Sequence, residues 1–87
     1  MAKQVIKFYA DWCGPCKIYG PTFERVKQDL QDIVEFKNIN VEQDTDNLSG
    51  EYKVKGIPHT VLLVDGELVK SHSGRMNEEQ LKEFILN

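Results

Sequence analysis

The stretch FYADWCGPCK, at residues 8–17, decides the fold of this chain. Residues 4–9, which are rich in β-branched and aromatic side chains, predict a strand that leads into it, and a helical pattern begins at Pro15. The only two cysteines of the 87 residues are Cys13, which lies between these segments, and Cys16, which lies at the start of the helical one. A disulfide across so short a loop removes little entropy from the unfolded chain, so we interpret the pair as reactive rather than as a structural crosslink.

A structural zinc site is the main alternative for a Cys-x-x-Cys pair. Such sites use four ligands, whereas this pair supplies two, and the histidines His59 and His72 lie far away in the sequence. A permanent disulfide is also unexpected in a reducing compartment. We therefore predict a redox-active Cys13–Cys16 disulfide, with no metal and no bound cofactor.

The composition indicates one small domain over residues 1–87. The chain is 40% hydrophobic and 29% charged, as is typical of globular proteins, and its formal net charge of -3 offers no basic surface to nucleic acid. No apolar run approaches the roughly 20 residues that cross a bilayer, and the first residues lack the apolar segment of a secretory signal. We expect a cytoplasmic protein that binds neither nucleic acid nor membrane.

The remaining segments predict alternating strands and helices. Helical spacing continues from residue 15 to residue 30, where Pro21 is expected to bend the axis. Residues 33–41 predict a second strand, and residues 46–52 a short helix. The apolar run 60–64, the Asp65-Gly66 turn and residues 67–72 then predict a hairpin. A capping box and hydrophobic staple, which start the last helix, involve Met76, Asn77, Gln80 and Leu81.

The residues around the cysteines resemble the active site of the thioredoxin family. The resemblance covers nearly the whole chain and includes further motifs in the family's order, namely Pro21, residues 56–58, residues 65–67 and Gly74. It implies a thioredoxin-like α/β fold, a four-stranded mixed sheet in the order βαβαββα with three helices on its two faces. The strand and helix that usually begin the family's fold are expected to be missing, so that a core of glutaredoxin size remains.

The resemblance implies a protein disulfide reductase that works by thiol–disulfide exchange. Cys13 is the expected nucleophile, because the N–H groups and dipole at a helix N-terminus favour a thiolate. Cys16, one turn further on and expected to be more buried, would resolve the mixed disulfide. Gly14 lets a partner backbone approach. Pro15 fits the first helical turn, because the backbone N–H that proline lacks has no partner within the helix at this position.

Several other residues are candidates for contact with a partner. Trp12 either covers the dithiol and offers an apolar contact or is a half-buried core aromatic. The resemblance implies that Pro58 is cis and turns the backbone of Ile57 toward a bound peptide, whereas the alternative is an ordinary turn proline. Gly74 either gives a partner room or is a plain loop glycine.

Lys7 departs from the family's pattern. Members usually carry a buried aspartate six residues before the first cysteine, paired with a lysine whose nearest match here is Asn38. A Lys7 amine that faces the dithiol would stabilise a thiolate or carry the proton of Cys16, whereas the alternative is a side chain that extends to the edge of the sheet. His59 either adds pH dependence near neutrality or fills the core.

The resemblance also implies partners. Electrons would come from a flavin- and NADPH-dependent thioredoxin reductase or from glutathione with glutaredoxin, and clients would include ribonucleotide reductase and peroxide-handling enzymes. The protein would then serve electron transport and cell redox homeostasis. Two other functions stay open: a docking subunit of a larger enzyme that is insensitive to its redox state, and a disulfide oxidant or isomerase. The Gly-Pro pair between the cysteines resembles reductants rather than oxidants.

Overall fold

A computed structural model describes residues 2–87 of the protein and confirms the predicted order of strands and helices. The elements are β1 (Lys3–Tyr9), α1 (Gly14–Leu30), β2 (Val34–Asn40), the 3-10 turn η1 (Val41–Gln43), α2 (Leu48–Glu51), β3 (His59–Val64), β4 (Glu67–Ser73) and α3 (Glu78–Leu86). Their bounds lie within two residues of the predicted ones. The turn η1 was not predicted. The helix α1 continues through Pro21, which cannot donate a backbone hydrogen bond.

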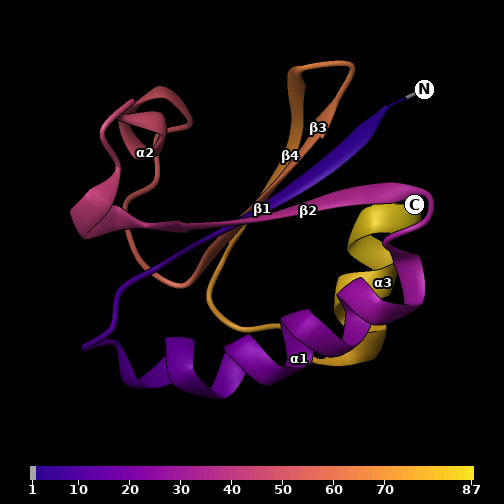
Figure 1. Ribbon diagram of the computed structural model, residues 1–87, viewed down its shortest axis with the longest axis horizontal. Coiled ribbons are helices and arrows are strands. Elements are labelled where there is room, and N and C mark those ends of the chain that lie inside the picture. Colours follow the sequence, from indigo (N-terminus) through magenta and orange to yellow (C-terminus); the bar gives the residue numbers. More distant parts are fainter. Residues whose placement is uncertain (1) are drawn as a thin grey trace.

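The four strands form one mixed sheet in the order β2-β1-β3-β4. β1 pairs in parallel with β2 and antiparallel with β3, and the β3–β4 hairpin is antiparallel. Figure 1 shows α1 and α3 together on one side of the strands and α2 on the other. The strand that leads to the cysteines is therefore central, with a neighbour on each side.

Each face of the sheet has its own hydrophobic core, because successive side chains of a strand point to opposite faces. The core under α1 and α3 includes Val5, Phe23, Val26, Leu81 and Ile85. The core on the α2 face includes Ile6, Phe8, Val61 and Leu63. The two cores hold β1 between them and so fix the end of β1, where the chain turns toward the cysteines.

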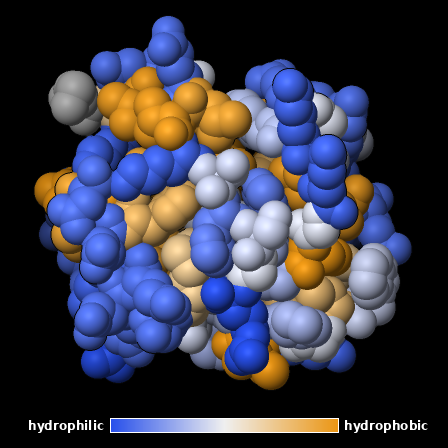
Figure 2. Space-filling view, turned by 180° about the vertical axis from the view of Figure 1, so that it is seen from behind, coloured by the Kyte–Doolittle hydropathy of each residue, from blue (hydrophilic) through white to orange (hydrophobic). Residues whose placement is uncertain are grey.

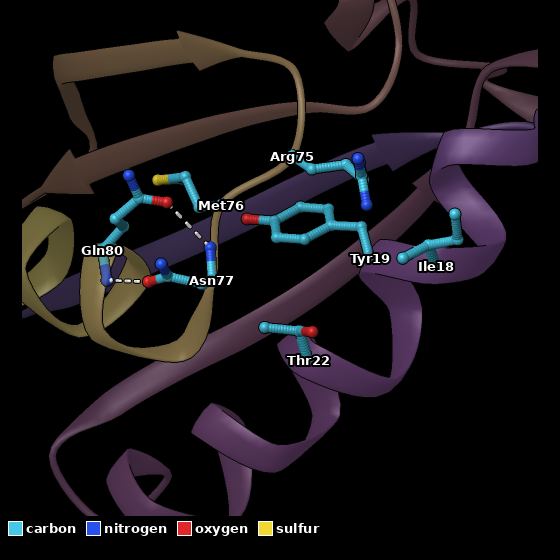
Figure 3. Close-up of a pocket in the computed structure, with 7 residues that line it drawn as sticks. All are labelled: Ile18, Tyr19, Thr22, Arg75, Met76, Asn77 and Gln80. Carbon is cyan, nitrogen blue, oxygen red and sulfur yellow. Dashed lines mark hydrogen bonds between the residues drawn. The ribbon is translucent and has the colours of Figure 1, made fainter.

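The start of α3 follows the predicted capping box. Asn77 accepts a hydrogen bond from the Gln80 N–H at 2.7 Å, and the Gln80 side chain accepts one from the Asn77 N–H at 3.0 Å (Figure 3). Met76 and Leu81 are both buried in the core under α1 and α3, as a hydrophobic staple requires. The local sequence thus determines where α3 begins.

The β3–β4 hairpin turns at Asp65 and Gly66, both with positive φ, at 53° and 85°. These values are typical of the tight turn that Asp-Gly predicts. Beyond the turn, Leu68 and Val69 are exposed on β4. Figure 2 shows an apolar patch at the end of the molecule that holds this hairpin, away from the cysteine end of the sheet. Across residues 2–87, none of the helices has the length and hydropathy that a membrane crossing requires.

Candidate active site

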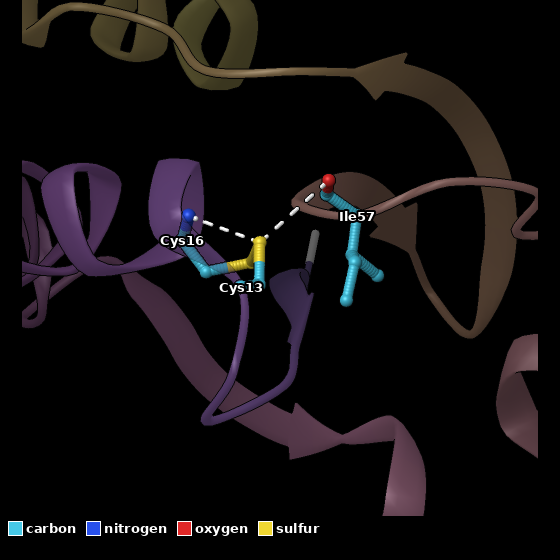
Figure 4. The surroundings of a disulfide bond; sticks show 3 residues. All are labelled: Cys13, Cys16 and Ile57. Atoms are coloured by element: carbon cyan, nitrogen blue, oxygen red, sulfur yellow. Dashed lines mark hydrogen bonds between the residues drawn. A yellow bond between two sulfur atoms is a disulfide. The ribbon is translucent and has the colours of Figure 1, made fainter.

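A disulfide between Cys13 and Cys16 lies at the N-terminus of α1, where β1 ends. Cys13 is the N-cap residue with an extended backbone, and Gly14 and Pro15 form the first helical turn. The backbone N–H of Cys16 donates to Cys13 Sγ at 3.2 Å (Figure 4). The Cys13 sulfur therefore occupies the position in which a capping side chain accepts from the helix backbone.

The two cysteines are equally buried, each with 5% of its surface exposed. The expectation that Cys16 is the more buried one is wrong for this disulfide form. Both side chains share one small cluster with Ala10, against which Val41 and Ile57 pack. The sequence analysis did not identify Ala10 as a site residue. Its carbonyl accepts a hydrogen bond from the Cys13 N–H at 3.2 Å. Its small size and its place three residues before Cys13 were the available signals.

The loop before β3 lies against the disulfide. The Sγ atom of Cys13 is 3.8 Å from the carbonyl oxygen of Ile57, a contact in which the reduced thiol is the donor (Figure 4). The Ile57–Pro58 peptide bond is cis, as expected. Gly74 donates its N–H to the Pro58 carbonyl at 2.8 Å and has a φ of 97°, a conformation that favours glycine. A Cβ at Gly74 would meet no atom of the described chain within 4 Å, so the space at this residue is open.

The surface next to the disulfide is partly apolar. Trp12 is 67% exposed, so the alternative of a half-buried core aromatic is wrong. Gly14 is exposed, and within residues 2–87 no atom lies within 4 Å of the position that a Cβ there would take. Trp12 and Gly14 therefore present an exposed surface next to Cys13 in the sequence.

Lys7 is buried in the middle of the sheet, opposite Asn38 of β2 and Thr60 of β3. Its Nζ lies 5.0 Å from the ring centroid of Phe23 and 5.3 Å from that of Tyr9. Burial lowers the pKa of Lys7. The negative charge of Glu24 opposes this effect and raises the same pKa. The alternative in which the side chain extends to the edge of the sheet is wrong, because β1 is an internal strand.

A crevice of about 270 Å³ opens beside the disulfide and reaches Lys7. Its lining comes from β1, the loop after it and the first turns of α1: Lys7, Tyr9, Ala10, Asp11, Cys16, Lys17 and Gly20. A larger groove of about 490 Å³ lies between α1 and the start of α3 (Figure 3). Neither cysteine lines the larger groove, so the crevice is the cavity that bears on the chemistry.

His59 is buried on the α2 face, where its ring lies 6.4 Å from that of Phe8. Its Nδ1 lies 3.0 Å from the hydroxyl oxygen of Ser73, whereas its Nε2 has no hydrogen-bond partner among residues 2–87. Burial, together with the nearby His72, lowers the pKa of His59. This arrangement fits the core-filling alternative. Within residues 2–87, no group of three or more His, Cys, Asp or Glu side chains could hold a metal ion.

A cysteine pair at a helix N-terminus, held against a proline loop on a mixed sheet, defines the class of thiol–disulfide exchange proteins. Comparisons with known proteins agree with this class. The sequence pattern of the family described as Thioredoxin matches residues 1–87. Thioredoxin of Mycoplasmoides gallisepticum is 41% identical over 83 residues, which cover 95% of this chain and 81% of that protein. Thioredoxin of Bacillus subtilis is 36% identical over 78 residues, with coverages of 90% and 74%.

Solved structures show the same fold. Thioredoxin of Fasciola hepatica superposes with a TM-score of 0.86 at 34% identity, over 97% of this chain and 78% of that one. A chain from a study of thiol resolution in yeast mitochondrial 1-Cys peroxiredoxin superposes with a TM-score of 0.85 at 36% identity, with coverages of 97% and 76%. The protein belongs to the thioredoxin family. It is a thiol–disulfide oxidoreductase with a redox-active cysteine pair.

Proposed function

We propose that the protein reduces disulfides of client proteins, with Cys13 as nucleophile and Cys16 as resolving thiol. One observation carries this assignment: Cys13 Sγ accepts the Cys16 N–H at 3.2 Å at the start of α1. The same N–H and the positive end of the helix stabilise a negative charge on that sulfur. Cys13 Sγ accepts the backbone N–H of Cys16. The two sulfurs therefore differ in this hydrogen bond, although the two residues are equally buried.

The reaction has two exchange steps. The Cys13 thiolate attacks one sulfur of a client disulfide, and the other client sulfur leaves as a thiolate that takes a proton from solvent. Cys16 loses its proton and attacks the Cys13 sulfur of the mixed disulfide. The second client sulfur leaves, and the Cys13–Cys16 disulfide closes. Two electrons pass from the protein to the client, which is released with two thiols.

The client is expected to bind across the exposed end of the site. Trp12 offers an apolar face, because it is 67% exposed. Backbone groups around Ile57 and the open space at Gly74 suit an extended client segment, which pairs with the loop as an added strand. Gly14 has no side chain, and a Cβ there would meet no atom of the described chain within 4 Å, so a client backbone has room to approach beside Cys13.

The partners follow from the family, whose members act on protein disulfides together with a reductase. We infer that a flavin- and NADPH-dependent thioredoxin reductase, or glutathione with glutaredoxin, reduces the Cys13–Cys16 disulfide. Ribonucleotide reductase and peroxide-handling enzymes are the client classes to test first, and a structural neighbour comes from work on a peroxiredoxin. We infer that residues 1–87 act as one domain in the cytoplasm, within electron transport and redox homeostasis, and need neither nucleic acid nor membrane.

Insulin reduction by dithiothreitol tests the proposal. The wild-type protein should accelerate the precipitation of reduced insulin, whereas Cys13→Ser should show only the background rate. After removal of dithiothreitol, reduced Cys16→Ser should accumulate a mixed disulfide with the client, visible on a non-reducing gel, because it has no second thiol to release Cys13 from the client. Trapping by Cys13→Ser instead would reverse the two roles. Equal binding of a larger enzyme by the wild-type protein and by a variant that lacks both cysteines would support the docking-subunit function.

A further inference from the structure

A buried lysine shares the crevice beside the disulfide with Cys16. We propose that the amine of Lys7 accepts the proton of the Cys16 thiol in the resolving step and, as an ammonium, stabilises the thiolate that forms. This proposal rests on the proposed function and adds a catalytic group to it. The proposal gives the buried amine of Lys7 a chemical role, in addition to the packing of its side chain between the sheet and α1.

The backbone places the Lys7 amine beside the helix that carries Cys16. Alternation along β1 directs Lys7 to the face covered by α1. Gly20, one helical turn after Cys16, has no side chain, and a Cβ there would lie 3.7 Å from the Lys7 Nζ. The amine therefore lies close to the backbone of α1, and Lys7 and Cys16 line the same crevice. A crevice of about 270 Å³ has room for a water molecule to relay the proton.

The surroundings of Lys7 favour exchange of its proton. Within residues 2–87, no carboxylate lies within 4.0 Å of the Lys7 Nζ. The rings of Tyr9 and Phe23 attract a cation only weakly compared with the loss of hydration. Burial lowers the pKa of Lys7, and the more distant Glu24 opposes this. An amine in such a site gives up its proton more readily than an exposed lysine and can then act as a base.

Other charged groups near the crevice are exposed at its mouth. Asp11 and Lys17 line it and carry opposite charges, and both are open to solvent. The neighbouring strands place uncharged Asn38 and Thr60 opposite Lys7. Lys7 is thus the one ionisable amine buried in the described part of the crevice.

The proton and the electrons balance in the proposed step. The Cys16 S–H bond breaks, its proton moves to the Lys7 nitrogen, and the electron pair stays on sulfur. This sulfur attacks the Cys13 sulfur of the mixed disulfide, and the client sulfur leaves with the electron pair of the broken S–S bond. The Lys7 ammonium then returns its proton to the departing client thiolate or to solvent.

A two-phase reaction with 5,5′-dithiobis(2-nitrobenzoate) separates the two cysteines. Attack by Cys13 releases the first thionitrobenzoate at a rate that depends on reagent concentration. Attack by Cys16 on the resulting mixed disulfide releases the second, at a rate independent of concentration. Stopped-flow absorbance of the reduced full chain measures both phases as a function of pH.

Lys7→Met should slow the second phase about tenfold near neutral pH. Without a nearby base or cation, the Cys16 thiol ionises at a pH about one unit higher. The pH of half-maximal rate should rise by about one unit, and the two proteins should converge in strong alkali. The first phase should change by less than about twofold. Lys37→Met is the matched control, since it removes an exposed lysine of β2 that does not line the crevice and should leave both phases unchanged.

A merely structural role gives a different result. Methionine fills the buried space without a charge, so oxidised Lys7→Met should unfold at the same or a higher urea concentration than wild type. An unchanged second phase, or equal slowing of both phases, would overturn the proposal. Lys7→Gln supplies the same readout should Lys7→Met fail to fold. A wild-type protein that releases only one equivalent would instead refute the proposed function itself, and the role of Lys7 with it.

Discussion

The hydroxyl groups of Tyr19 and Thr60 lie 2.8 Å apart in the interior and form a hydrogen bond between α1 and β3. Tyr19 follows Cys16 by three residues, and Thr60 follows Pro58 by two. Their side chains are almost completely buried, at 1% and 0% exposure. This bond therefore ties the helix that carries the cysteines to the strand that carries the proline loop, 41 residues apart in the sequence.

Tyr19→Phe should lower the free energy of unfolding by about 1 kcal/mol, because it removes this hydrogen bond and leaves the Thr60 hydroxyl unpaired. Urea unfolding at neutral pH measures the loss. Thr60→Val completes a double-mutant cycle, in which the double variant should lose less than the sum of the two single losses. Additive losses would show that the two hydroxyls do not stabilise the fold through each other.

The same tyrosine predicts a loss of stability in alkali. Burial raises the pKa of Tyr19 from 10.0 to about 12 in the folded protein. The unfolded chain loses this proton first, so the contribution of Tyr19 is fully present below pH 10 and declines as the pH rises toward 12. Wild type should therefore lose stability more steeply than Tyr19→Phe over this range. Parallel curves from urea unfolding would contradict the assignment.

Two lysines from the sheet bind the C-terminal end of α3. Lys3 donates to the Ile85 carbonyl at 2.9 Å, and Lys70 donates to the Phe84 carbonyl at 3.0 Å. Helix carbonyls at this end lack partners within the helix and carry the negative end of its dipole. Lys3→Met and Lys70→Met should each lower the free energy of unfolding by about 0.5 kcal/mol.

Thermal unfolding at low and high salt tests these contacts. The exposed Lys37 makes no hydrogen bond in the described chain, so Lys37→Met is the matched control and should change stability less than either variant. Equal effects of all three substitutions would mean that the loss reflects net charge rather than the α3 carbonyls.

The sequence predicted those elements that short-range signals determine. Asn77 and Gln80 contact each other three residues apart, and Asp65-Gly66 makes a tight turn from its own backbone preferences. The position of the cysteines at a helix start follows from the neighbouring Pro15 and the strand before it. Such features depend on a few adjacent residues, so one sequence is enough to predict them.

Contacts between distant segments could not be predicted in this way. The cluster that holds Cys13 and Cys16 is covered in part by Val41 and Ile57, which come from distant parts of the sequence. The internal position of Lys7 follows from the strand order, which places β1 between β2 and β3. The sequence indicated that Lys7 was unusual, and only the packing of α1 on β1 reveals that its amine lies beside Gly20.

Trp12→Ala should slow the reaction with protein disulfides about fivefold, because a large exposed aromatic near the nucleophile contributes about 1 kcal/mol or more to contact with a partner. Its effect on stability should stay within about 0.5 kcal/mol, since the side chain is mostly in solvent. Insulin turnover measures the first effect. Ile33→Ala, which truncates a side chain that is 65% exposed in the turn between α1 and β2, should leave turnover unchanged. Equal slowing in both variants would argue against a docking role for Trp12.

His59→Phe should make the protein less sensitive to acid. Burial, with a smaller effect of His72, lowers the pKa of His59 below 6.5 in the folded state. The unfolded chain then binds the proton first as the pH falls, so wild type is most stable above pH 6.5 and loses stability as the pH drops through the lowered value. Phenylalanine keeps a ring against Phe8 but cannot be protonated.

The measurement is the urea midpoint at several pH values from about 7.5 down to about 5. The lower end of this range lies below the pH at which an unperturbed histidine titrates. At the upper end, His59→Phe should be slightly less stable than wild type, because it loses the 3.0 Å contact with Ser73. The difference should shrink or reverse toward acid pH. His72→Gln removes an exposed histidine, which is the smaller of the two causes that lower the pKa of His59. This variant should therefore keep most of the wild-type dependence of stability on pH. If His72→Gln flattened the curve and His59→Phe did not, the acid sensitivity would originate at the surface and not in the core beside Phe8.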